Sequence, residues 1–206
     1  MSKPESGKTF EVKCVVVGNT GTGKTCILQR LAFDTYIDNP EPTVSAANFF
    51  ETIQYGNTTL KMEVWDTVGR EMYMALNKIF CGGSKIVVFT YDITNKQSFD
   101  SIESLWLPLV KECVDKNPVL CIAGNKADKY NEEQVSEEIA KQYAEKIDAL
   151  YKQTSALQGN GIKELFNEAG KKYLETIGEK IIVNKENKVK KLKKVSKEND
   201  KRKNCC

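Results

Sequence analysis

A glycine-rich segment near the N-terminus carries residue types suited to binding phosphate. Residues 18–25 read GNTGTGKT, which fits the pattern GxxxxGK[ST], and they lie between a valine-rich run and a stretch of helical character. Glycines in such a loop let backbone N–H groups converge on phosphate oxygens, and the N-terminus of the following helix adds its positive end. Lys24 would contact the terminal phosphates, and the Thr25 hydroxyl would be a ligand of Mg²⁺. The residues expected to contact a nucleotide here are Thr20, Gly21, Thr22, Gly23, Lys24, Thr25 and Cys26.

A second segment indicates which base that nucleotide carries. Residues 124–128 read GNKAD and directly follow the apolar run Val119–Ala123, so they stand at the carboxyl end of a predicted strand, where ligands of open α/β sheets bind. The Asp128 carboxylate can accept both the ring N–H and the exocyclic NH₂ of guanine, whereas adenine would leave it unpaired. Residues 154–156 (TSA) offer backbone N–H groups for the guanine carbonyl. The sequence therefore predicts a guanine site formed by Asn125, Lys126, Asp128, Ser155, Ala156 and Leu157.

The composition excludes several other kinds of chemistry. The 206 residues include no histidine, which removes histidine triads, histidine general bases and histidine-ligated metals. Five of the seven cysteines stand singly without CxxC spacing, so we expect them to be small core side chains in a reducing compartment. The N-terminus lacks the apolar segment of a secretion signal, and no apolar run approaches the roughly 20 residues of a membrane span.

Short apolar runs alternate with longer amphipathic stretches along the chain. Strands are predicted at Phe10–Val17, Ala47–Gln54, Thr59–Trp65, Ile86–Tyr91, Val119–Ala123 and Ala149–Gln153, and helices near 26–33, 98–114, 132–147 and 161–178. Residues 55–57 predict a turn that joins the second and third strands into a hairpin. This alternation predicts an α/β fold with a mostly parallel, six-stranded sheet, helices on both faces and one antiparallel edge strand.

Together these motifs resemble those of a small GTPase of the Ras superfamily. The phosphate loop, the Asn-Lys-x-Asp segment and the Ser-Ala pair occur in the order and spacing of that family. Residues 65–71 (WDTVGRE) resemble the Trp-Asp-Thr-Ala-Gly-Gln-Glu segment of the Rab branch, and residues 91–99 (YDITNKQSF) and the Cys-Cys at 205–206 are also Rab-like. The resemblance covers residues 10–178 and the C-terminus, and it implies a fold of the P-loop NTPase type.

The resemblance also implies roles for residues between these motifs. Asp66 would hold Mg²⁺ through a water molecule, and the Gly69 amide would sense the γ-phosphate. Thr43 matches the threonine of the first switch, which ligates Mg²⁺ only in the triphosphate state, and Tyr36 would pack its ring against the guanine. The two switch segments would then be ordered by GTP and Mg²⁺ and released on hydrolysis. The implied metal ligands are Thr25, Thr43 and Asp66.

The chain departs from the family pattern at several positions. Arg70 stands where the family carries the glutamine that orients the attacking water; a guanidinium has five donors and no acceptor, so we expect slow hydrolysis. Two alternatives stay open: Arg70 is a solvated residue without mechanistic consequence, or its guanidinium rescues hydrolysis. Catalytic roles are assigned to Arg70, Gly69 and Lys24. Thr20 and Val68 replace smaller residues, Leu157 replaces the lysine usual after Ser-Ala, and residues 45–49 depart from the usual effector segment.

The C-terminal segment differs in charge from the rest of the chain. Residues 180–206 hold 11 Lys/Arg and 3 Asp/Glu, whereas the whole chain has a net charge of +3. Such a tail contacts nucleic acid or an anionic membrane, and the absence of aromatic residues among its lysines argues against nucleic acid. The Rab resemblance implies geranylgeranylation of Cys205 and Cys206, and a location on the cytosolic face of a membrane. We divide the chain into an extension (1–9), a G domain (10–179) and a flexible tail (180–206).

Three functions are weighed on this basis. The first is a Rab-like switch in membrane trafficking, with GTP or GDP as ligand and Mg²⁺ as cofactor. Its implied partners are effectors bound through residues 36–50 and 67–80, an exchange factor, an activating protein, a GDP-dissociation inhibitor and the prenylation machinery. The second is a GTP-dependent binding module that barely hydrolyses, which Arg70 favours. The third is an unrelated P-loop ATPase or kinase, which the Asn125–Asp128 segment disfavours.

Overall fold

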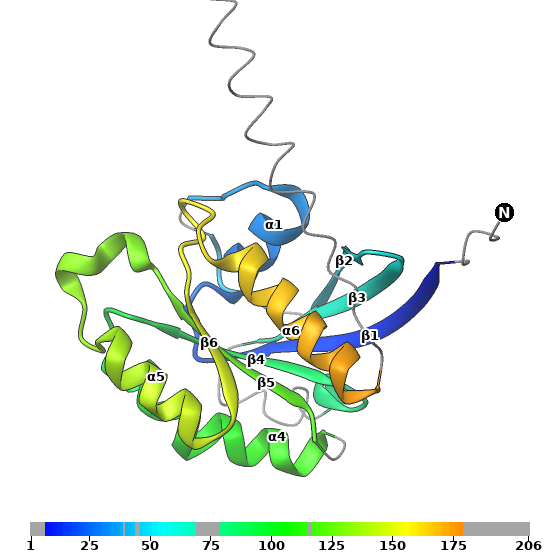
Figure 1. Cartoon of the computed structure of the whole chain (residues 1–206). Coiled ribbons are helices and arrows are strands. Elements are labelled where there is room, and N and C mark those ends of the chain that lie inside the picture. Colours follow the sequence, from blue (N-terminus) through cyan, green and yellow to red (C-terminus); the bar gives the residue numbers. More distant parts are fainter. Residues whose placement is uncertain (1–6, 39, 44–45, 69–78, 115–116, 179–206) are drawn as a thin grey trace, which may run out of the picture.

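A single six-stranded sheet organises the molecule (Figure 1). The computed structural model describes residues 7–38, 40–43, 46–68, 79–114 and 117–178. The strands are β1 (Lys8–Val17), β2 (Ala47–Tyr55), β3 (Thr58–Asp66), β4 (Ile86–Asp92), β5 (Val119–Asn125) and β6 (Ala149–Gln153). The helices are α1 (Lys24–Phe33), α3 (Lys96–Ser101), α4 (Leu107–Cys113), α5 (Glu137–Lys146) and α6 (Ile162–Thr176), with a π-helical segment at Ile102–Trp106 and a 3₁₀ helix at Ala127–Glu132.

The strand order is β2-β3-β1-β4-β5-β6, and every neighbouring pair is parallel except β2 with β3. The predicted antiparallel edge strand is therefore confirmed, as is the hairpin, whose turn uses Gly56 at a φ of 61°. Strand β1 begins two residues before the predicted Phe10, because the Lys8 amide bonds the Asn57 carbonyl and Lys8 pairs with Thr58. The predicted extension 1–9 thus overlaps the sheet at its last two residues.

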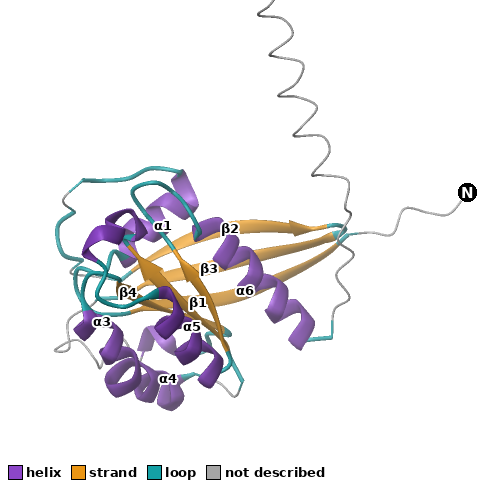
Figure 2. Cartoon of the chain, turned by 60° about the vertical axis from the view of Figure 1, so that its left-hand side comes forward, coloured by secondary structure: helices purple, strands orange, loops and turns teal. Residues whose placement is uncertain are grey.

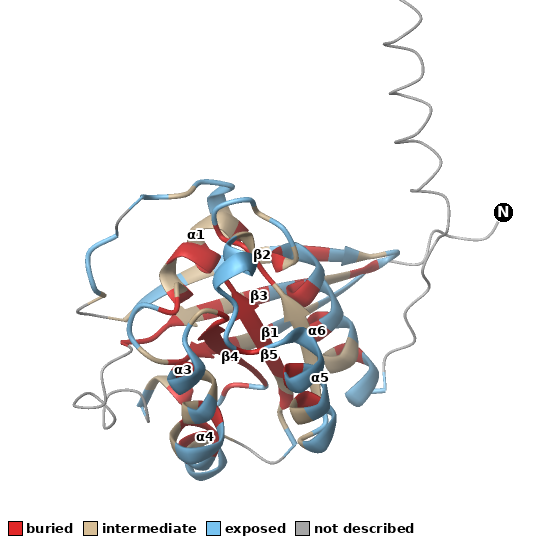
Figure 3. Cartoon of the chain, turned by 90° about the vertical axis from the view of Figure 1, so that its left-hand side faces the viewer, coloured by how far each residue is buried: buried red, intermediate tan, exposed pale blue. Residues whose placement is uncertain are grey.

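Both faces of the central strands are buried, which explains their uninterrupted apolar sequences (Figure 3). On β1, Cys14 and Val16 belong to the core beneath α1 and α6, whereas Val15 and Val17 belong to the core beneath α4 and α5. Figure 2 shows the sheet between these helices. Because the strands run parallel, the carboxyl ends of β1, β4, β5 and β6 meet at one edge of the sheet, and the loops that follow them lie together there.

Two predicted helices differ from the structure in detail. The helix predicted at 132–147 begins only at Glu137, where the Ser136 side chain accepts from the Ile139 amide, a cap typically contributing about 1 kcal/mol. The amides of Gln134 and Val135 instead donate to the Ile93 carbonyl. This stretch is therefore hydrogen-bonded to the loop after β4 and is not helical. The helix predicted at 98–114 is present as α3 and α4, with the π-helical segment between them.

In the part of the chain that the structure describes, no helix combines the length and apolarity needed to cross a bilayer. The predicted tail at 180–206, with Cys205 and Cys206, lies outside the described residues. So does the segment 69–78, which contains Gly69 and Arg70.

Candidate nucleotide-binding site

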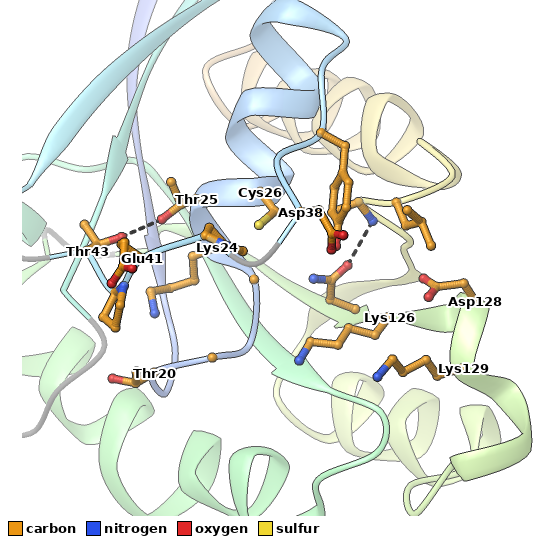
Figure 4. Close-up of a pocket in the computed structure, with 18 residues that line it drawn as sticks. Thr20, Lys24, Thr25, Cys26, Asp38, Glu41, Thr43, Lys126, Asp128 and Lys129 are labelled. Atoms are coloured by element: carbon orange, nitrogen blue, oxygen red, sulfur yellow. Dashed lines mark hydrogen bonds between the residues drawn. The ribbon is translucent and has the colours of Figure 1, made fainter.

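A cavity of about 840 Å³ opens at the carboxyl edge of the sheet (Figure 4). It is formed by the loop after β1, the start of α1, the segment 36–43, the loop after β5 and the loop after β6. The predicted nucleotide contacts that line it are Thr20, Gly21, Gly23, Lys24, Thr25, Cys26, Tyr36, Thr43, Asn125, Lys126, Asp128, Ala156 and Leu157. A volume of this size suits a ligand larger than a single phosphate group.

The loop after β1 brings its lysine into the cavity as a buried cation. Lys24 is 5% exposed, and its Nζ donates to the carbonyl oxygens of Gly18 at 2.8 Å and Asn19 at 3.0 Å. Burial lowers the pKa of Lys24 to about 8, while the nearby Asp66 charge opposes this shift. Gly23 has a φ of 86°, and a β-carbon there would lie 2.4 Å from Asn125 Nδ2, so only glycine fits this close approach.

The three predicted metal ligands meet at one point. The Thr25 hydroxyl donates to Asp66 Oδ2 at 2.6 Å, and it lies 2.7 Å from the Thr43 hydroxyl. Asp66 is 1% exposed, and its Oδ1 is buried without a hydrogen-bond partner among the described residues. Burial raises the pKa of Asp66, which the Thr25 hydrogen bond and the Lys24 charge oppose.

This oxygen cluster fits a hard divalent cation. Mg²⁺ prefers one or two protein oxygens together with phosphate oxygens and water, and here two hydroxyls and a partly unpartnered carboxylate supply them. Within the described ranges no group of three histidine, cysteine, aspartate or glutamate residues could hold a metal ion. A cation at this site would therefore depend on the hydroxyls and on a bound phosphate.

Asn125 links the phosphate side of the cavity to the base side. Its Nδ2 donates to the Thr22 carbonyl at 2.8 Å, and its Oδ1 accepts from the Thr154 hydroxyl and the Ala156 amide, each at 3.3 Å. Thr22 and Ser155, two predicted nucleotide contacts, do not line the cavity: both are buried behind it. Their contacts with Asn125 and Asp128 place them as supports of residues that do line it.

Asp128 stands at the base end of the cavity, held by a hydrogen bond from the Ser155 hydroxyl to its Oδ1. Lys126 adopts a φ of 66°, and its Nζ forms an ion pair with Asp92 Oδ2 at 2.6 Å. This pair fixes the side chain of Lys126, two residues before Asp128. Tyr36 is half-buried and lines the same cavity. Its packing against a guanine ring stays a prediction.

Sequence reasoning missed the role of Asn19. Its Oδ1 accepts from the Trp106 indole at 2.7 Å, and its Nδ2 donates to the Ser101 hydroxyl at 3.0 Å. Its carbonyl accepts from Lys24 and from the Thr22 hydroxyl. Trp106 is fully buried at the end of the π-helical segment, so this irregular turn holds the phosphate loop from outside.

The cavity also includes residues outside the predicted motifs. Asp38, Pro40, Glu41 and Pro42 line it from the first-switch segment, and Lys129 lines it after the base motif. The sequence signal for these residues as part of the cavity was only that they lie close to Thr43 or Asp128 along the chain. The predicted catalytic pair Gly69 and Arg70, and part of the predicted effector ranges 36–50 and 67–80, lie outside the described residues.

Comparison with known proteins finds relatives over most of the chain. Residues 13–175 match the Ras family. The Ras-related protein Rab-22A of Homo sapiens is 36% identical over 166 residues, covering 81% of this chain and 85% of that protein. Rab-31 of Rattus norvegicus is 38% identical over 156 residues, covering 76% and 80%. RABF2a of Arabidopsis thaliana is 33% identical over 165 residues, covering 80% and 82%.

Proposed function

Since the chain belongs to the Ras family of small GTPases and is of the Rab type, we propose that it is a switch that binds GTP or GDP with Mg²⁺ in the cavity at the carboxyl edge of the sheet. One observation carries this proposal: Thr25 and Thr43, whose hydroxyls form an oxygen cluster with the buried Asp66 behind them, line the same cavity as Asn125 and Asp128. A cation site and a guanine-selective carboxylate are thereby joined by a loop suited to phosphates.

The residues divide the work along the cavity. Lys24 and the amides at the start of α1 bind the phosphates, and Asp128 reads the base edge. Thr25 and Thr43 would hold the metal directly and Asp66 through water. Bound Mg²⁺ would neutralise charge that develops on the phosphate oxygens during transfer. The Thr43 hydroxyl lies against Thr25. A γ-phosphate with its Mg²⁺ would hold the first-switch segment in this position, and loss of the γ-phosphate would release it.

Base selectivity tests the binding part of the proposal. Competition of GDP and ADP against a fluorescent guanine nucleotide measures both affinities on one protein. We expect GDP to bind at least about a thousandfold more tightly, because adenine leaves the Asp128 carboxylate and its partners unpaired. Equal affinities would favour the P-loop ATPase or kinase alternative instead.

Slow hydrolysis is the finer part of the proposal and rests on Arg70. The attacking water must be held in line with the γ-phosphate, and the family's glutamine both accepts from that water and donates to phosphate. Arginine donates only, and it is long enough to extend into solvent. Thr20, which lines the cavity at the phosphate loop, is a second departure from the family pattern.

The comparison of wild type with Arg70→Gln in single-turnover GTP hydrolysis tests this directly. We expect the glutamine variant to hydrolyse about tenfold faster or more, a change of about 1.4 kcal/mol in the barrier. If it hydrolyses no faster, Thr20 or Val68 becomes the better suspect, and Thr20→Gly is the next variant. Hydrolysis that is undetectable in wild type and restored by Arg70→Gln would favour the second candidate, a GTP-dependent binding module.

We place this switch in membrane trafficking because its relatives are Rab proteins and because its tail ends in two cysteines after a basic run. The same reasons support prenylation at Cys205 and Cys206 and the regulators expected of such a switch. A pull-down with the protein loaded with a non-hydrolysable GTP analogue, against the GDP form as control, tests for effectors. Partners retained equally by both forms would contradict the switch.

A further inference from the structure

One arginine outside the predicted motifs joins the end of α1 to the loop after β6. Arg30 lies in the last turn of α1 and does not itself line the cavity. Its Nε donates to the Ala156 carbonyl at 2.9 Å, and its Nη2 donates to the Leu157 carbonyl at 2.9 Å. Its Nη1 donates to the Asp34 carbonyl at 2.8 Å. Its side chain is 17% exposed; the bond to Ala156 is partly buried, whereas the bonds to Leu157 and Asp34 lie at the surface.

The two loop carbonyls are the informative ones. In a trans peptide the C=O and the following N–H point in opposite directions. Because Arg30 holds the Ala156 and Leu157 carbonyls, the amides of Leu157 and Gln158 point away from it. The Gln158 amide accordingly donates to the Ser155 hydroxyl at 3.1 Å, and the Leu157 amide belongs to a residue that lines the cavity.

The Leu157–Gln158 plane is also held by the bond from the Gln158 amide to Ser155, whereas the Ala156–Leu157 plane depends on Arg30. The hairpin-like closure of the loop uses the pairing of Ser155 with Asn160 and the Gly159 amide bonding the Ser155 carbonyl at 2.7 Å. Neither contact involves the Ala156 or Leu157 carbonyls. Gly159 lies against the arginine, since a β-carbon there would come 3.4 Å from Arg30 Cδ. A planar guanidinium, with its donors in a fixed fork, suits this double capture in a way a lysine ammonium does not.

We propose that Arg30 is a positioning residue for the guanine site: its fork fixes the peptide planes at Ala156 and Leu157 so that the Leu157 N–H faces the carbonyl oxygen of the base. The inference rests on the proposed binding of guanine nucleotides and names a residue that governs how long they stay bound. The same side chain holds the Asp34 carbonyl at the end of α1, where the segment leading to Tyr36 and Thr43 begins.

The test compares nucleotide release from wild type, Arg30→Met and Arg30→Lys. Methionine keeps most of the apolar stem and lacks all donors, while lysine keeps the charge but not the fork. We expect Arg30→Met to release GDP about tenfold faster with little change in association rate, because charge-assisted hydrogen bonds that hold the loop are lost. Arg30→Lys should recover only part of this difference.

A modified base separates positioning from general loosening. 6-Thio-GDP keeps the ring N–H and amino group that Asp128 reads, but replaces the carbonyl oxygen by a poorer acceptor. We expect Arg30→Met to accelerate its release by less than about threefold, since the affected contact is already weak, as in a double-mutant cycle. The ratio of IDP to GDP release rates, which reports the contact of the amino group with Asp128, should change by less than about twofold.

Two control variants complete the experiment. Lys172→Met removes a comparable set of contacts, Nζ with the Asp148 carbonyl and carboxylate, far from the cavity, and should leave every release rate unchanged. Asp34→Asn keeps the backbone acceptor and removes only the exposed charge, so it should change GDP release by less than about twofold.

Equal acceleration of GDP and 6-thio-GDP by Arg30→Met, or no acceleration, would overturn the assignment. So would an Asp34→Asn effect as large as that of Arg30→Met. Failure of the underlying function is distinguishable, because wild-type protein would then show no preference for GDP over ADP.

Discussion

At the scale of single residues, Asp128 makes the most specific claim about the ligand. Its carboxylate lines the cavity, and because only Oδ1 accepts from Ser155, Oδ2 and a second lone pair of Oδ1 can still accept the two N–H donors of guanine. Asp128→Asn exchanges one acceptor for a donor, so we expect GDP affinity to fall by at least about a hundredfold. Xanthosine diphosphate, which presents a carbonyl where guanine has its amino group, should bind the variant better than GDP.

Competition binding with GDP and xanthosine diphosphate checks this prediction, with Asp148→Asn as a control at an exposed carboxylate. Unchanged GDP affinity in Asp128→Asn would mean that the base is read elsewhere.

Thr25 provides a second prediction at this scale. Its hydroxyl touches both Asp66 and Thr43, so asparagine there disturbs the whole oxygen cluster. We expect Thr25→Asn to weaken GTP binding more than GDP binding, because the metal and Thr43 matter most with a γ-phosphate present. Thr25→Ser retains the hydroxyl and should bind both nucleotides like wild type. Titrations of both nucleotides with and without Mg²⁺ measure the difference; equal losses would indicate general damage to the loop.

Residues that line the cavity were largely predictable from sequence, and the residues that support them were not. Lys24, Asn125 and Asp128 are set by local spacing, and all three line the cavity. Asn19 and Arg30 act through partners 87 and about 126 residues away, and no local pattern carries such a contact. The sequence indicated only that Asn19 lies within the phosphate loop and that Arg30 lies in the helix that follows it.

At the scale of elements, burial on both faces made the strands easy to predict, since their apolar runs leave few alternatives. The helices were harder because their limits depend on contacts between elements. Gln134 and Val135 fit a helical pattern in the sequence, but their amides donate to the Ile93 carbonyl instead. The hydrophobic periodicity of the sequence does not reveal this competing contact. The π-helical segment is similarly invisible in sequence, although it decides where Trp106 points.

Trp106 therefore supplies the prediction for this scale. Trp106→Phe keeps an aromatic ring in the buried site and removes the indole N–H that Asn19 accepts. We expect GDP release to accelerate about threefold to tenfold, because the partly buried Asn19 oxygen loses its partner and the loop loosens. The acceleration should be equal for GDP and 6-thio-GDP, since the contact acts on the phosphates.

Release kinetics of both nucleotides check this, with Trp65→Phe as the control. The Trp65 indole nitrogen is buried without a hydrogen-bond partner among the described residues, so removing its N–H should not affect release. A selective effect of Trp106→Phe on GDP alone would contradict its assignment to the phosphate loop.

At the scale of the whole molecule, charge is unevenly distributed along the chain. The last 27 residues carry 11 basic and 3 acidic side chains, while the chain as a whole is only +3. A basic segment next to an anionic lipid surface gains about 1 kcal/mol per Lys or Arg, and this attraction weakens as salt shortens the screening length. A single lipid chain anchors a protein only marginally, whereas two chains, or one chain with a basic patch, hold it stably.

The two cysteines at the end should therefore act together with that charge. Protein prenylated on Cys205 and Cys206 should stay on phosphatidylserine-containing vesicles at low salt and at about 1 M salt alike. Cys205→Ser, limited to one chain, should bind at low salt, depend on the anionic lipid and dissociate as salt rises. Cys205→Ser/Cys206→Ser should bind weakly at low salt only. Co-sedimentation with neutral and anionic vesicles distinguishes these cases. If the double variant stays bound at high salt, neither lipid nor tail charge is the anchor, and the body of the protein must contact the membrane itself.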